Sequence, residues 1–148
     1  MKRLIAFILI LAPLFGLIGI RNKNEFWNVD GVSKAIVATK ESPDGWDVLE
    51  TMELNYITVK KEDLSQILKN IKAEGIMLFA NDSGLNNLLK SLNMLVFKEE
   101  NVNGMNVVYG FTPKYEDYVL VDGKKINVQI ASTRQEHVVG FPIILSGF

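Results

Sequence analysis

Residues 94–131 read MLVFKEENVNGMNVVYGFTPKYEDYVLVDGKKINVQIA and contain two signals for tight β-hairpins. Asn103-Gly104 and Asp122-Gly123 each stand between apolar stretches, and such dipeptides favour the positive φ angles of two-residue hairpin turns. Strands joined by these turns run antiparallel, so we expect an antiparallel sheet in this part of the chain. The strands predicted on either side of the two turns are residues 94–98, 105–111, 118–121 and 124–131.

Upstream of these hairpins, the spacing of apolar residues predicts a helix over residues 61–74. Glu62 and Asp63 lie in its first turn, where the helix dipole favours acidic side chains. Gly75 follows as the expected C-cap. The apolar residues recur at intervals of three and four, which places them on one helical face. They are Leu64, Ile67, Leu68 and Ile71.

A second, shorter helix is predicted after an apolar strand over residues 76–80. Asp82 or Ser83 is the expected N-cap, because both side chains can accept a hydrogen bond from the first turn. The apolar face of this helix repeats the spacing of the first. Its members are Leu85, Leu88, Leu89 and Leu92.

Three further elements are predicted outside this region. The spacing of apolar residues over 26–41 favours a helix, and alternation over 46–59 favours a strand with the even positions buried. Residues 138–145 form the last apolar run, with Pro142 placed at a sheet edge or bulge because proline lacks a backbone donor. Helices grouped apart from an antiparallel sheet indicate an α+β fold. We expect one such domain over residues 24–148.

The first twenty residues resemble a membrane-targeting segment. Lys2 and Arg3 are followed by seventeen residues, 4–20, without a charge. A positive start before an apolar run is typical of a signal peptide, although the run lacks a clear small-residue cleavage site. We therefore expect residues 1–20 to be either a cleaved signal peptide or an N-terminal membrane anchor. Either form places the rest of the chain outside the cytoplasmic membrane.

Composition excludes several classes of function. The chain has no Cys and one His, which excludes disulfides, thiolate metal sites and a Cys nucleophile. Of its 16 basic residues two lie in the leader, so the exported part carries 14 basic and 17 acidic residues, a net charge of −3. A net negative charge is not typical of nucleic-acid-binding proteins. We expect no cofactor, no metal site and no nucleic-acid partner.

Three side chains are candidates for chemistry. His137 could serve as a general base or pH sensor, but it follows a polar segment that reads more simply as a connection between strands. Asn127 and Gln129 lie two residues apart on one predicted strand, so their amides share a face. Paired amides can bind the polar groups of a peptide or sugar. They can equally tie the strand to a neighbouring loop.

Three short segments of the C-terminal third resemble the YwmB-like family. These segments are YGFTP at 109–113, GKKINVQIA at 123–131 and GFPII at 140–144. Phe141 departs from the threonine that this family has at that step. The link over residues 132–138 is also shorter than the family's.

Members of the YwmB-like family are exported proteins of Gram-positive, largely spore-forming bacteria with a fold like that of the TATA-box-binding protein. The resemblance implies an α+β fold with two or three helices packed on one face of a curved antiparallel sheet. It implies no catalytic residues, since no enzymatic activity is established for the family. If the family shares a ligand, Asn127 and Gln129 are where we expect it.

These observations leave three hypotheses for function. The first is a non-enzymatic binding or interaction module of the cell envelope, with a connection to sporulation, whose partner is an envelope protein or a wall ligand. The second is an envelope hydrolase with two carboxyl groups about 5–9.5 Å apart across a cleft. The third is a cytoplasmic domain held at the membrane through residues 4–20, which Lys2 and Arg3 before the apolar run oppose.

Overall fold

The computed structural model describes residues 25–145, and the predicted leader over residues 1–20 lies outside them. Ten strands and two short α-helices make up this part of the chain. The helices are α2 (Leu64–Asn70), which follows the 3-10 turn η1 (Lys61–Asp63), and α3 (Asp82–Leu92). The strands are β1 (Val32–Thr39), β2 (Val48–Glu50), β3 (Asn55–Lys60), β4 (Ala73–Ala80), β5 (Leu95–Val102), β6 (Met105–Phe111), β7 (Val119–Val121), β8 (Lys124–Ile126), β9 (Val128–Ser132) and β10 (His137–Phe141).

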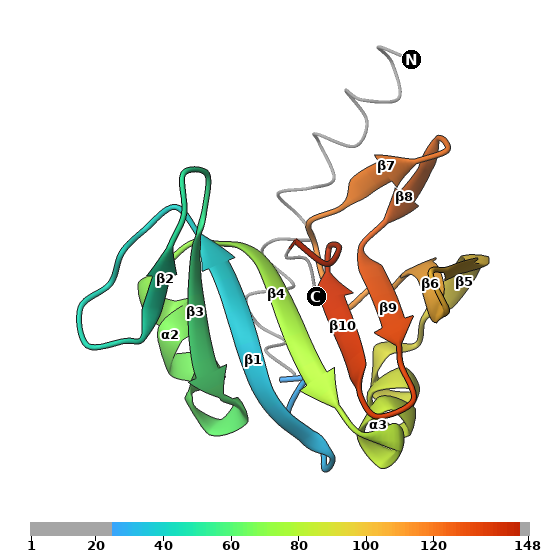
Figure 1. Ribbon diagram of the computed structural model, residues 1–148, viewed down its shortest axis with the longest axis horizontal. Coiled ribbons are helices and arrows are strands. Elements are labelled where there is room, and N and C mark those ends of the chain that lie inside the picture. The colour runs from blue at the N-terminus through green and yellow to red at the C-terminus, as the bar shows by residue number, and fades with distance from the viewer. Residues whose placement is uncertain (1–24, 146–148) are drawn as a thin grey trace.

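Eight of the strands form a single antiparallel sheet in the order β2-β3-β1-β4-β10-β9-β6-β5 (Figure 1). The strands β7 and β8 pair only with each other and form a separate hairpin beside the β6 end. The sheet is open, with β2 at one edge and β5 at the other. The prediction of an α+β fold with helices packed on an antiparallel sheet is confirmed.

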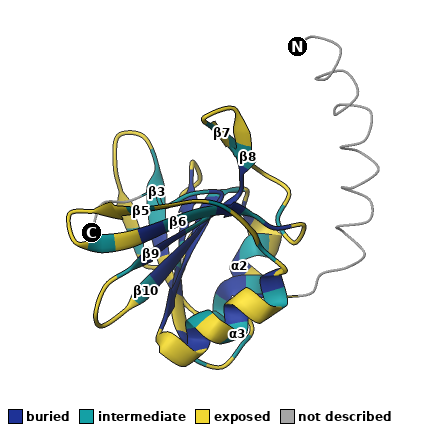
Figure 2. Ribbon diagram, turned by 90° about the vertical axis from the view of Figure 1, so that its right-hand side faces the viewer, coloured by how far each residue is buried: buried dark blue, intermediate teal, exposed yellow. Residues whose placement is uncertain are grey.

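The main core lies between this sheet and the two helices (Figure 2). Leu64 and Ile67 of α2 and Leu88 and Leu92 of α3 are fully buried there. Burying one such side chain contributes roughly 1.5–3 kcal/mol relative to leaving it exposed. Because both helices contribute to one cluster, that cluster holds the two halves of the sheet together.

The opposite face of the sheet, called the outer face below, carries a second and smaller apolar cluster. Met77, Phe79 and Val138 are buried in it. Side chains packed around them come from β1, β3 and the segment that follows β10, namely Ile36, Tyr56 and Ile144. Residues 142–145 therefore lie against the outer face after β10 ends.

Both predicted hairpin turns are confirmed. Asn103 and Gly104 have φ angles of 52° and 85°, and Asp122 and Gly123 have φ angles of 51° and 76°. Two consecutive positive φ angles are the conformation that Asn-Gly and Asp-Gly adopt at low cost. The turns fix the registers of β5 with β6 and of β7 with β8.

The predicted helix over residues 26–41 is wrong, because half of that stretch is β1 and the rest forms turns, bends and irregular chain. Ala35 and Val37 face the main core while Ile36 faces the outer face. A strand buried on both faces reads as a continuous apolar run, which hides its period of two. The β-branched residues of β1 fit a pleated strand better than a helix.

Boundaries of three other elements also differ from the predictions. Gly75 lies inside β4 and caps no helix, because α2 ends at Asn70. The N-cap of α3 is Asn81, whose Oδ1 accepts a hydrogen bond from the Gly84 N–H at 2.8 Å. Pro142 was expected at an edge or bulge, but it directly follows β10, a strand at the centre of the sheet. Proline ends this strand because it cannot donate to the ladder.

The alternation predicted over residues 46–59 has the wrong phase in its second half. The segment is a hairpin of β2 and β3, with a bend at Thr51, where the Thr51 N–H bonds the Leu54 carbonyl. In β3 the buried side chains are the odd residues Ile57 and Val59, while Met52 in the bend is fully exposed. The bend shifts the register of the second strand, so one alternation cannot describe both.

Candidate functional site

Asn127 lies at the break between β8 and β9 and is completely buried. Its Oδ1 accepts a hydrogen bond from the Thr112 N–H at 2.7 Å. Its Nδ2 donates to the carbonyls of Thr112 at 2.7 Å and Tyr115 at 2.6 Å. The amide therefore bonds the segment that connects β6 to β7, which is one of the two uses left open by the sequence.

Gln129 lies on β9 opposite Tyr109 of β6 and is half-buried. Its Oε1 accepts a hydrogen bond from the Ile144 N–H at 2.9 Å. Gln129 thus binds a backbone group of the segment after β10, whereas Asn127 binds the segment between β6 and β7. The two amides have separate partners within the chain.

His137 begins β10 and connects it with two other elements. Its Nδ1 lies 2.8 Å from the Ser132 Oγ on β9, and its Nε2 lies 2.7 Å from the Asp82 Oδ1 at the start of α3. A neutral imidazole protonated at Nε2 satisfies both contacts, with the serine hydroxyl as donor to Nδ1. Asp82 could not be identified as a partner from the sequence, because 55 residues separate it from His137.

This serine, histidine and aspartate arrangement resembles the relay of a hydrolase, but its surroundings differ. Acyl transfer needs N–H groups free to bind an oxyanion near the serine. In the turn after β9, the Thr133 N–H bonds the Glu136 carbonyl, and the Gln135 and Glu136 N–H groups bond the Thr133 hydroxyl. The contacts of His137 with Ser132 and Asp82 join α3 to the β9–β10 hairpin.

The edge strand β5 is the most exposed strand of the sheet. Among the described residues it pairs only with β6, so its other edge has unpaired backbone groups. Leu95 and Val96 are 60% and 54% exposed. Most of the large exposed apolar side chains belong to β5 or to the neighbourhood of β7. They are Leu95, Val96, Val102, Tyr118 and Leu120. These five residues and the charged residues 98–100 are together called the β5 surface.

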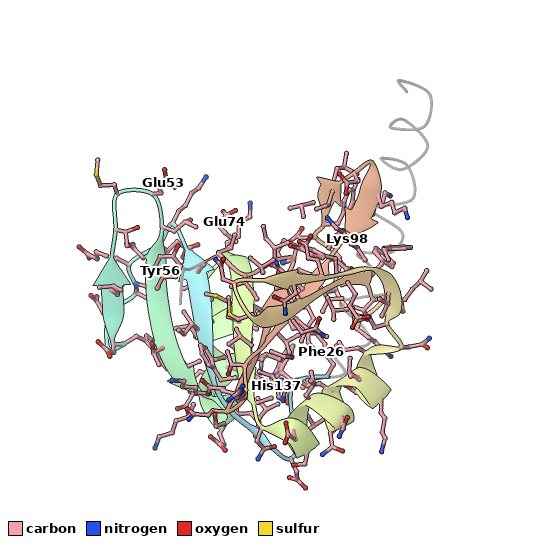
Figure 3. The ribbon with its side chains drawn as sticks, turned by 45° about the vertical axis from the view of Figure 1, so that its right-hand side comes forward. Phe26, Glu53, Tyr56, Glu74, Lys98 and His137 are labelled. Atoms are coloured by element: carbon pink, nitrogen blue, oxygen red, sulfur yellow. The ribbon has the colours of Figure 1, made fainter. Side chains whose placement is uncertain are left out.

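Contacts between side chains place the β7–β8 hairpin next to β5. The Lys98 Nζ lies 3.9 Å from the Asp122 Oδ2, and the Lys124 Nζ lies 5.5 Å from the centre of the Phe97 ring. Figure 3 shows Lys98 near this hairpin and His137 well away from it, beside α3. The β5 surface is thus formed by two neighbouring elements, the strand β5 and the β7–β8 hairpin.

Glu100 and Lys98 form a charged pair on β5 that is supported by Tyr109 of β6. The Tyr109 hydroxyl donates to Glu100 Oε1 at 2.8 Å, and the Lys98 Nζ lies 3.1 Å from Glu100 Oε2. The hydrogen bond from Tyr109, followed by that from Lys98, lowers the pKa of Glu100. A general acid of a hydrolase needs a raised pKa instead, so Glu100 does not support the hydrolase hypothesis.

We expect Tyr109→Phe to raise the pKa of Glu100 towards its ordinary value, because the phenol hydrogen bond is the main cause of its lowered pKa. The Glu100 pair stabilises the fold above the ordinary carboxyl pKa, and this contribution is lost as the pH falls through the lowered value. NMR titration of the Glu100 carboxyl measures the change. Tyr118→Phe is the matched control, and an unchanged Glu100 titration in Tyr109→Phe would contradict the assignment.

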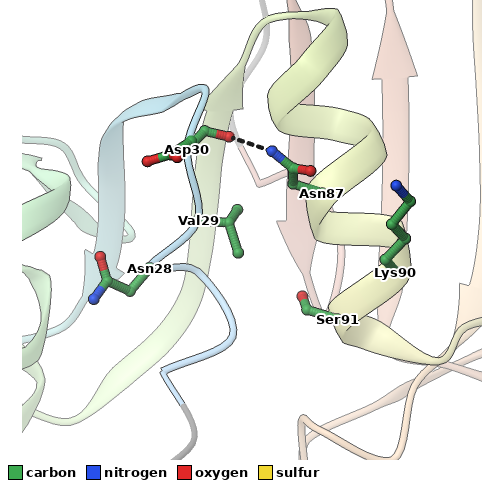
Figure 4. A pocket seen from close by; sticks show the side chains of 6 residues that line it. All are labelled: Asn28, Val29, Asp30, Asn87, Lys90 and Ser91. Carbon is green, nitrogen blue, oxygen red and sulfur yellow. Dashed lines mark hydrogen bonds between the residues drawn. The ribbon is translucent and has the colours of Figure 1, made fainter.

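A shallow groove of about 550 Å³ lies between residues 28–30 and α3 (Figure 4). The Asn87 Nδ2 donates to the Asp30 carbonyl at 3.0 Å, and the Ser91 hydroxyl donates to the Phe26 carbonyl at 3.2 Å. Two of its polar side chains are thus already bonded to the chain's own backbone. The remaining lining residues are Asn28, Val29, Asp30 and Lys90.

Comparisons with known proteins add no family to this description. No family model, curated protein or solved structure matches this chain. The resemblance of residues 109–144 to the YwmB-like family stays a prediction. Within residues 25–145 no helix is long and apolar enough to span a membrane. The same residues contain no group of three or more His, Cys, Asp or Glu side chains that could hold a metal ion.

Proposed function

We propose that this protein is an exported, non-enzymatic interaction module of the bacterial cell envelope that binds an extended segment of a partner protein along β5. The observation that carries the proposal is the free edge of this strand, which is eight residues long and bears exposed apolar side chains. A partner strand added to such an edge gains backbone hydrogen bonds, and side-chain contacts select its sequence.

The charged residues of β5 make this edge selective. Lys98, Glu99 and Glu100 interrupt its apolar side chains, and the register shift between Val96 and Lys98 bends the strand. Charges and bulges on edge strands discourage indiscriminate pairing. A partner strand must therefore match this pattern of charges and apolar side chains.

The other edge strand, β2, provides a natural comparison. It has only three residues, and Leu49 on it is 67% exposed. A strand this short offers few backbone groups to a partner. The β5 edge is thus the better site for strand addition, although both edges carry exposed apolar side chains.

The proposed location rests on the sequence. The apolar run over residues 4–20 after Lys2 and Arg3 supports export, and the resemblance to the YwmB-like family supports an envelope role in a Gram-positive, spore-forming cell. We further propose that the leader is either removed or anchors the domain on the outer side of the cytoplasmic membrane.

A photo-crosslinking experiment on the full chain tests this proposal. A photoreactive amino acid is placed at position 95, or at position 49 on β2 as the matched control, in cells that express the protein naturally. We expect one defined adduct from position 95 in intact cells stripped of their wall. Val96→Asp in the same chain should abolish this adduct, because a buried unpaired charge opposes docking.

Two results would contradict the proposal. Equal adducts from positions 95 and 49 would show that the capture is not specific to β5. Protection of the chain from protease added outside the stripped cells would show that it does not face the envelope.

A further inference from the structure

The free edge of β5 presents the backbone groups of alternate residues (Figure 1). The residues that flank a two-residue hairpin turn exchange both of their backbone hydrogen bonds. Val102 and Met105 flank the turn at Asn103-Gly104, so the backbone of Val102, and of every second residue before it, points toward β6. The N–H and C=O groups of the residues in between, Glu99 and Asn101, therefore point away from β6 along the free edge.

The charges of β5 complement those of a second copy of the same strand. Lys98 and Glu100 lie two residues apart, so their side chains share one face of the strand. The Lys98 Nζ lies 3.1 Å from Glu100 Oε2 within the chain. A two-fold axis at Glu99, which lies between them, would place Lys98 of each copy opposite Glu100 of the other. The two copies would then form a ring of four alternating charges.

The backbone geometry of β5 permits this register. Residues that face each other in an antiparallel pair must both direct their backbone groups toward the partner strand or both away from it. An axis at Glu99 meets this condition, and residues 98–100 lie beyond the register shift between Val96 and Lys98. On either side of this centre, Val102 of each copy approaches Val96 of the other. These side chains are 38% and 54% exposed, so pairing covers apolar surface at both ends.

Other two-fold registers oppose like charges without compensation. An axis at Lys98 would place the two Lys98 side chains opposite each other, and an axis at Glu100 would do the same with Glu100. The axis at Glu99 also sets Glu99 against its own copy, but two pairs of opposite charge accompany this contact. Opposite charges across two strands stabilise a sheet, whereas like charges directly opposite each other destabilise it. The edge strand β2 has no basic residue and so has no such complementary pattern.

We infer that the partner strand bound by β5 is β5 of a second copy of this chain, in an antiparallel, two-fold symmetric pair centred on Glu99. The inference rests on the proposed function, because it names the occupant of the same edge. Pairing joins two eight-stranded sheets into one continuous sheet and covers the β5 edge of both copies. A two-fold contact is closed, so it leaves no β5 edge for a third chain.

Cysteine crosslinking of the full chain tests the pair, because the chain has no cysteine of its own. The Cα atoms of a directly opposite, hydrogen-bonded pair are about 5.5 Å apart, within the range of a disulfide. We therefore expect Glu99→Cys to give a disulfide-linked product of twice the chain mass when expressing cells are oxidised with copper phenanthroline. The matched control is Asn101→Cys, which also faces the free edge. Its two copies would lie four residues, or about 14 Å, apart along the pair and should not crosslink.

Exchanging charges between the copies tests the register. In the Glu99→Cys chain, Lys98→Glu sets acidic side chains opposite each other, and Glu100→Lys sets basic ones opposite each other. We expect either substitution alone to weaken pairing about tenfold. When the two variants carry tags of different length and are expressed together, every acidic side chain meets a basic one. A mixed product should then form as efficiently as in the parent chain, and this recovery also shows that both variants fold.

The combined results separate this inference from the proposed function. Equal crosslinking of Glu99→Cys and Asn101→Cys, or no recovery in the mixed expression, would overturn the pairing of two copies at Glu99. An absent disulfide together with a photo-adduct from position 95 to a different protein would overturn this inference and leave the proposed function standing. The absence of both products would overturn both, whereas a photo-adduct of twice the chain mass would support both.

Discussion

Replacing Asn127 with alanine is expected to lower the free energy of unfolding by about 3–5 kcal/mol. The side chain is fully buried and makes three hydrogen bonds to the backbone of Thr112 and Tyr115. Alanine removes all three and leaves the Thr112 N–H without this partner, and each unsatisfied buried group costs roughly 1–3 kcal/mol. Chemical denaturation followed by circular dichroism measures the change.

Asn106→Ala is the matched control for this substitution. Asn106 lies on β6, is exposed, and makes one side-chain hydrogen bond, to Glu99 at 3.3 Å. We expect a change within about 0.5 kcal/mol, as is usual at exposed sites. A similar small effect for Asn127→Ala would contradict a structural role for its amide.

Gly84→Ala is expected to destabilise the fold by about 2–3 kcal/mol, although alanine is the better helix former by about 1 kcal/mol. Gly84 lies in the first turn of α3 and contacts the backbone of Gly31, which has a φ of 89°. A Cβ at Gly84 would lie 2.3 Å from the Gly31 carbonyl oxygen. The start of α3 must therefore move away from the residues that lead into β1.

The matched control on the same helix is Asn86→Ala at an exposed position. Here only helix propensity changes, so we expect a gain of a few tenths of a kcal/mol. Thermal unfolding of the two variants gives the comparison. A gain in stability for Gly84→Ala would mean that α3 does not pack against Gly31 in solution.

The sequence predicted those elements whose signals are local. Asn103-Gly104 and Asp122-Gly123 specify their turns through their own φ preferences, so both hairpins are found as expected. The predicted apolar face of α3 is confirmed at Leu88 and Leu92, which are fully buried, but Leu89 is 37% exposed. The helix predicted in place of β1 failed because burial of Ile36 depends on which strands become its neighbours, and that is set by the whole sheet.

The candidate site residues also differ in whether local sequence or the whole fold determines their contacts. The position of Gln129 on a strand could be predicted, but its contact with Ile144 depends on the return of the chain across the outer face. Asp82 could not be assigned to His137, because no local pattern joins residues 55 positions apart. Predicting that Leu95 is exposed would have required the strand order, since a strand with the same sequence could lie at the centre of a sheet.

The position of β10 between β4 and β9 also affects the order in which the protein can fold. Pairing of β10 with β4 joins residues 137–141 to residues 76–80, so this central ladder has a high contact order. Until residues 137–141 are available, β4 and β9 each have an exposed edge that can pair with other chains. Non-local ladders of this kind form slowly. The last strand to be synthesised among the described residues is therefore the one that closes the sheet, so the chain depends most on protection from aggregation just before β10 joins it.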